Sequence, residues 1–201
     1  MVVFDLEFSG LDFTFSNTSI LSIGAVSFEN PEETFYKECR IWEGAEVEDE
    51  ALKITGFTME QITDPKKPLP HEITEEFIDW LKKYKDRTLG GQNIYTDYYM
   101  FVGELWRSKL KFQPGFRLVE LHALAYQKYL QLGKEIPLHE GFSELGLPKI
   151  LRLCGIDFKG PIPHNALEDA KITAECFSRL INGKSILKEF EDYPVPEYLL
   201  R

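Results

Sequence analysis

Four carboxylates and one histidine have types and spacings that could carry out chemistry. The first two, Asp5 and Glu7, lie two residues apart on a predicted buried strand, so their side chains point to the same face. Carboxylates that converge in this way repel each other unless they are protonated or bridged by metal, and burying them unpaired is costly. A divalent cation is the usual compensation. The alternative is a strand end whose acids face water.

The third carboxylate, Asp97, lies four residues after Asn93, so the two share a face if the segment is helical. The preceding Gly90-Gly91 turn would let backbone approach a ligand. The plainer interpretation makes Asn93 an N-cap and Asp97 a first-turn acid stabilised by the helix dipole. An aromatic run here is either a base-stacking face or, as we expect for most of it, core: Tyr95, Tyr98, Tyr99 and Phe101.

The histidine, His164, precedes a helix whose first turn holds the fourth carboxylate, Asp169. Asn165 is the predicted N-cap, and Glu168 three residues later completes a capping-box pattern. His164 follows a loop over 157–163 that is rich in Gly and Pro, and a histidine on such a loop can move over a site and exchange protons near neutrality. The alternatives are a solvated loop histidine and an acid that only stabilises the helix dipole.

Composition indicates an ordinary globular chain. Its 201 residues suit one domain with a sizeable core, and 43% are hydrophobic against 28% charged. We expect no membrane span and no export, because no apolar run is long enough and Asp5 interrupts the opening. Three cysteines without a C-x-x-C pair predict a reducing, cytoplasmic location. The net charge of −10 argues against broad capture of duplex DNA but not against a single-stranded end held at metals.

Hydrophobic periodicity predicts strands first and then alternating helices and strands, which favours an α/β sandwich. The expected strands are 1–6, 19–28, 34–41, 87–92 and 116–119. The expected helices are 48–54, 59–62, 71–84, 95–109, 120–132, a helix from Ser143 to 154, and one that follows Asn165. The tail from Lys184, which carries Pro194 and Pro196, is expected to pack as an extended arm.

The order and spacing of these motifs resemble the DEDDh exonucleases, the histidine branch of a 3′–5′ exonuclease superfamily. The segment from Phe4 to Leu11 is similar to the first motif of that family, and His164 to Ala170 is a very close match to its last motif. Similarity also covers 23–26, 54–58 and 146–156. The resemblance predicts an exonuclease domain over residues 1–182, followed by a tail over 183–201 that packs on the same domain.

The resemblance implies a ribonuclease-H-like fold, with a mixed five-stranded sheet in the order 3-2-1-4-5 and flanking helices. It also implies two Mg²⁺ or Mn²⁺ ions at the terminal phosphodiester. Asp5 would bridge both ions, Glu7 and Asp169 would complete one site, and Asp97 would support the other through water. His164 would be the general base, and the product would be a nucleoside 5′-monophosphate.

By the same resemblance, the residues Phe8, Ser9, Gly10 and Leu11 would line the pocket for the terminal nucleotide, and Asn93 would hold the geometry of the site. Three positions depart from the family pattern and concern substrate preference: Phe8, Gln92 and Glu120. The expected partners are single-stranded DNA or RNA 3′ ends or short oligonucleotides. The choice between DNA and RNA stays open, as does a homodimer or a polymerase-associated subunit. Two alternatives are a phosphodiesterase for short oligonucleotides or dinucleotides and a catalytically silent binding module.

Overall fold

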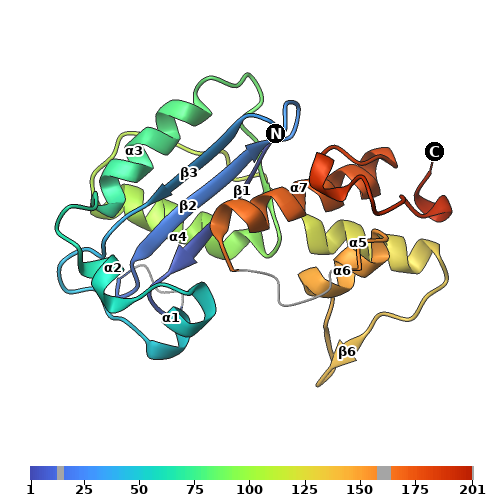
Figure 1. The fold of residues 1–201 in the computed structure, drawn as a ribbon, viewed down its shortest axis with the longest axis horizontal. Helices are drawn as coiled ribbons and strands as arrows, with labels where there is room; N and C mark the ends of the chain where they lie inside the picture. Colours follow the sequence, from blue (N-terminus) through green and yellow to red (C-terminus); the bar gives the residue numbers. More distant parts are fainter. Residues whose placement is uncertain (13–15, 158–163, 201) are drawn as a thin grey trace.

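The central element is a five-stranded mixed sheet in the order β3-β2-β1-β4-β5 (Figure 1). This computed structural model describes residues 1–12, 16–157 and 164–200. The strand order confirms the predicted order 3-2-1-4-5. The first three strands are antiparallel, and the last two run parallel to β1. Their bounds are β1 Val2–Phe8, β2 Ile20–Ser27, β3 Thr34–Glu38, β4 Leu89–Gly91 and β5 Val119–Glu120.

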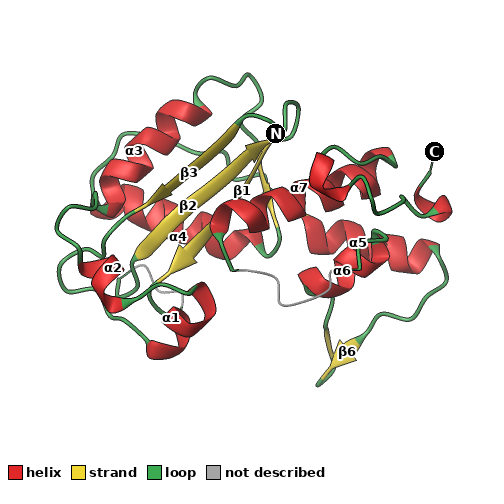
Figure 2. Cartoon of the chain, viewed as in Figure 1, coloured by secondary structure: helices red, strands yellow, loops and turns green. Residues whose placement is uncertain are grey.

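Helices cover both faces of the sheet (Figure 2). They are α1 Asp49–Thr55, α2 Met59–Thr63, α3 Pro70–Leu81, α4 Ile94–Arg107, α5 Leu121–Gln131, α6 Leu147–Leu153 and α7 Ala166–Asn182. Among the described residues, no helix is both long and apolar enough to cross a bilayer. The fold is therefore a three-layer arrangement, as the alternating pattern predicts.

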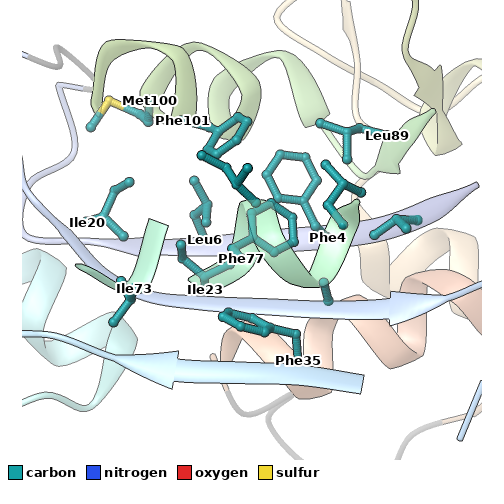
Figure 3. Close-up of a cluster of buried hydrophobic side chains, with 14 of the residues drawn as sticks. Phe4, Leu6, Ile20, Ile23, Phe35, Ile73, Phe77, Leu89, Met100 and Phe101 are labelled. Atoms are coloured by element: carbon teal, nitrogen blue, oxygen red, sulfur yellow. The ribbon is translucent and has the colours of Figure 1, made fainter. Parts of the chain in front are cut away.

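One face of the sheet is an aromatic core under α3 and α4. The even-numbered residues of β1 point into it, since side chains alternate along a strand. Phe4 stacks on Phe77 of α3 at a centroid distance of 5.8 Å, and Phe101 of α4 meets the Phe77 ring edge-on at 5.6 Å (Figure 3). The spacing of Ile73 and Phe77 explains why α3 buries one side.

The odd-numbered residues of β1 face α7, which crosses β1 and β2 on the opposite side (Figure 1). Val3 packs in a second core with residues of α5, α6 and α7, among them Phe177. Alternation therefore places Asp5 and Glu7 on the α7 side, at the end of β1 that extends beyond its pairing with β4.

Two sequence expectations need correction. Ser143 does not open a helix, because it lies in a small hairpin, β6 Leu138–His139 with β7 Phe142–Ser143, and α6 begins at Leu147 after Gly146. The tail is not simply extended. It forms two short 3-10 turns, η1 Lys188–Phe190 and η2 Glu197–Leu199, and buries Phe190 and Leu199. The expected loop over 157–163 lies, beyond Asp157, outside the described residues.

Candidate active site

Close packing of α7 on β2 brings distant acids together. Asp5 pairs with Gly24 of β2, and a Cβ built at Gly24 would lie 2.1 Å from the carbonyl carbon of Ala166 in the first turn of α7. Only glycine permits this approach. The first turn of α7 therefore lies over the end of β1, and one carboxylate oxygen each from Asp5, Glu7 and Asp169 lie within 4.8 Å of one another.

The start of α7 is held by Asn165, as predicted. Its Oδ1 accepts hydrogen bonds from the backbone N–H groups of Leu167 and Glu168 at 3.1 and 3.2 Å, and its Nδ2 donates to the Tyr36 hydroxyl of β3 at 3.0 Å. Glu168 points outward and pairs with Lys171 at 3.0 Å. Asp169, the next residue, is turned inward and is only 8% exposed.

The fourth carboxylate reaches the site from α4. β1 pairs with β4 only at Val2 and Val3, so the N–H of Leu6 lies beyond the end of β4. Asp97 fills this gap, and its Oδ1 accepts a hydrogen bond from the Leu6 N–H at 3.0 Å. An unpaired buried N–H is costly, so this contact both stabilises β1 and fixes the position of Asp97.

Glu120 is a positioning residue whose role the sequence reasoning missed. Asn93 occupies the N-cap position of α4 in a left-handed conformation (φ 54°), and its side chain makes no capping hydrogen bond. The two oxygens of Glu120 instead accept from the backbone N–H groups of Asn93 and Ile94, each at 3.1 Å. The only signal in the sequence was an acid at the end of the fifth strand.

A cavity of about 670 Å³ opens over the acids. All four carboxylates line it, and so does His164, which is exposed just before α7. Of the predicted substrate-binding residues, those that line the cavity are Phe8, Gly10, Leu11 and Asn93. Ser9 does not, because its hydroxyl donates to the Glu46 carbonyl at 2.7 Å and accepts from the Ser19 N–H at 2.9 Å.

Some aromatic residues of α4 belong to the core, and others line the cavity, where a base could stack on them. Phe101 is fully buried in the core, and Tyr98 packs against the same cluster. Tyr95 and Tyr99 line the cavity, with 67% and 47% of their surfaces exposed. Two exposed aromatic side chains therefore lie in the cavity wall.

The acids carry strongly perturbed proton affinities. Burial, followed by repulsion from Asp97, Glu7 and Asp169, raises the pKa of Asp5 well above its ordinary value. Burial and the charge of Asp169 raise the pKa of Glu7 to about 8, and burial raises that of Asp169 to about 7. Burial also raises the pKa of Asp97, against the Leu6 hydrogen bond that lowers it. In the described part of the chain, no lysine or arginine forms an ion pair with these four acids.

A mixed sheet in this order, with helices on both faces, is a ribonuclease-H-like fold. A family profile described as Exonuclease matches residues 2–177. The chain belongs to this exonuclease family, so it is a 3′–5′ exonuclease, and the resemblance to the DEDDh branch is confirmed.

Relatives support the same placement. Ribonuclease T of Enterobacter sp. (strain 638) is 27% identical over 215 residues, which cover 97% of this chain and 85% of that protein. The PolC-type DNA polymerase III of Thermotoga maritima is 28% identical over 181 residues, covering 90% of this chain and 12% of the polymerase.

Solved structures share the fold. The nuclease domain of 3′hExo, a DEDDh family member bound to rAMP, superposes with a TM-score of 0.67 at 18% identity and covers 93% of this chain and 94% of that one. E. coli exonuclease I, in complex with a dT13 oligonucleotide, gives 0.67 at 17% identity and covers 89% of this chain and 40% of that one.

Proposed function

We propose that this exonuclease removes nucleoside 5′-monophosphates from the 3′ ends of single-stranded DNA or RNA, with two divalent cations and a histidine base. The observation that carries the proposal is the convergence of Asp5, Glu7 and Asp169 in one cavity with Asp97 and His164. The complex of exonuclease I with a dT13 oligonucleotide supports a single-stranded substrate, and that of 3′hExo with rAMP supports a nucleoside monophosphate as product.

The donor set fits Mg²⁺ or Mn²⁺. Hard cations prefer carboxylate oxygens, and the Oδ1 of Asp169 is buried without a hydrogen-bond partner among the described residues. Asp5, Glu7 and Asp169 would hold the ions, and Asp97, which lines the same cavity, would support them. When bound, the ions would neutralise charge on the phosphodiester and make a water molecule more acidic.

The proton transfer is assigned to a protein side chain. His164 takes a proton from the attacking water, whose oxygen forms a bond to phosphorus as the bond to the 3′ oxygen breaks. The departing 3′ oxygen takes a proton from solvent, and the released nucleotide keeps its 5′-phosphate. His164 suits this role because it is exposed and lines the same cavity as the four acids.

The terminal nucleotide would lie against the loop after β1. Phe8, Gly10 and Leu11 form one wall of the cavity, and Ala51 and Ile54 of α1 form the next. Leu11 is tied in place because its N–H donates to Glu48 Oε1 at 3.0 Å. A residue fixed in this way orients a substrate without being ordered at each binding event. Asn93, which also lines the cavity, would hold the position of the phosphodiester.

The test uses single-stranded DNA and RNA oligomers with a fluorescent 5′ end, incubated with Mg²⁺, Mn²⁺ or EDTA. We expect a ladder shortened from the 3′ end and release of nucleoside 5′-monophosphates only with metal. Asp5→Asn and Asp169→Asn should abolish the ladder, while Glu168→Gln, which changes the neighbouring exposed acid, should keep it. Full activity of both site variants would overturn the proposal.

A further inference from the structure

A second cavity adjoins the first across the start of α4. Its volume is about 620 Å³, and its walls come from the β4–α4 junction, from α5, and from the segment that joins β7 to α6. Asn93 and Tyr95 line both cavities. The two cavities are therefore neighbours at the first turn of α4, so a linear ligand that passes over this turn could reach both.

The second cavity carries positive charge on an acidic protein. Lys149 and Arg152 of α6 line it, whereas the chain as a whole carries −10. Lys149 pairs with Glu144, which lines the same cavity. Arg152 is exposed and, in the part of the chain that the structure describes, its side chain is engaged in no ion pair or hydrogen bond. A planar guanidinium of this kind suits bidentate contact with a phosphate.

The shared border offers a stacking surface. Tyr95 is 67% exposed, and it lines both cavities. Nucleic-acid bases stack on exposed aromatic rings with little dependence on sequence. The polar groups behind it, which include His122 hydrogen-bonded to the Ser143 hydroxyl at 2.9 Å, form a wall that water or phosphate oxygens can contact.

We propose that this second cavity binds the two or three nucleotides upstream of the scissile phosphodiester, with Arg152 contacting a phosphate and Tyr95 contacting a base. The proposal rests on the proposed function, in which the terminal nucleotide lies against Phe8 to Leu11. The rest of the strand must then leave the catalytic cavity on another side, and the second cavity, which shares Asn93 and Tyr95 with the first and is lined by Arg152, lies next to it.

The test compares Arg152→Ala with wild-type protein on a single-stranded dinucleotide and an octanucleotide of the same base, with Mn²⁺. We expect kcat/KM for the octanucleotide to fall about tenfold and that for the dinucleotide to stay unchanged, because a dinucleotide does not reach Arg152. The slope of log(kcat/KM) against log salt for the octanucleotide should become shallower by about 0.7, as expected for one lost phosphate contact.

Lys188→Ala is the matched control, since Lys188 is an exposed cation of η1 that lines neither cavity. It should change neither substrate. Equal losses on both substrates for Arg152→Ala, or no loss on either, would overturn the inference while leaving the proposed function intact. Absence of cleavage of every substrate by the wild-type protein would instead refute the proposed function.

Discussion

Replacing Asp169 by asparagine should stabilise the metal-free protein, and more so at alkaline than at acid pH. Burial raises the pKa of this carboxyl from its ordinary 3.8 to about 7. Between these values the folded protein holds a proton that the unfolded chain releases, so the free energy of unfolding falls as pH rises from about 4 to about 7. A pKa difference of roughly three corresponds to about 4 kcal/mol. Asparagine removes this penalty because it never ionises.

One effect opposes this gain. Asp169 lies in the first turn of α7, where the helix dipole favours a negative charge by roughly 0.3–1 kcal/mol. Burial is the larger effect, so we expect a net gain of about 3 kcal/mol near pH 8. Near pH 5 we expect a gain of only about 1.7 kcal/mol, because the folded carboxyl is then protonated and much of the penalty is absent. Part of the raised pKa of Glu7 is due to the charge of Asp169. The stability effects of these two carboxyls are therefore coupled and do not add.

The assay is urea unfolding in EDTA, followed by circular dichroism near pH 5 and near pH 8. Glu168→Gln is the control, because it removes an exposed neighbouring charge that pairs with Lys171, and it should shift the free energy of unfolding by less than about 1 kcal/mol. Added Mn²⁺ should stabilise the wild-type protein by about 2.7 kcal/mol at a hundred times its Kd, and Asp169→Asn by much less. A variant less stable than wild type near pH 8, or a gain of equal size at both pH values, would refute the reasoning.

Three further changes test the other supports of the site. His164→Ala should slow cleavage by roughly 10²–10⁴-fold, because the imidazole takes a proton from the attacking water. The affinity for Mn²⁺, measured by calorimetry, should not change. A large loss of Mn²⁺ affinity would show instead that His164 is a metal ligand. Glu120→Gln should lower the free energy of unfolding in urea by about 1–3 kcal/mol and should lower kcat. The reason is that an amide has one acceptor oxygen for the two N–H groups that begin α4. Unchanged stability would contradict this. Gly24→Ala should lower the melting temperature sharply, since its Cβ would lie 2.1 Å from α7 backbone, whereas Gly115→Ala, with open space around it, should not.

The parts of the fold that follow from neighbouring residues were predictable. The apolar spacing of Ile73 and Phe77 places α3 within a few residues of its observed bounds, and alternation along β1 separates its two faces. The start of α6 was misplaced, because serine is common both at N-caps and in turns. Ser143 belongs to a hairpin, and the better signal was Gly146 followed by proline at the start of the helix.

The role of Glu120 could not be predicted from local pattern. The strand that carries it has only two residues, and the N–H groups it binds are 26 and 27 positions earlier in the chain. Nothing near Asn93 shows that its helix is capped from another strand. A contact of this kind depends on the parallel pairing of β4 with β5, which brings Gly91 beside Glu120.

The amino-acid sequence by itself determined which groups can do chemistry here: acids at a two-residue spacing on a strand, an acid in the first turn of each of two helices, and a histidine before the second helix. It also determined which face of β1 carries the first pair, because strand alternation is a property of neighbouring residues. Only the tertiary structure decided that Asp5 and Asp169 meet, since their approach depends on α7 backbone resting on Gly24. It alone decided the burial that raises their pKa values, because burial is set by packing from segments far along the chain.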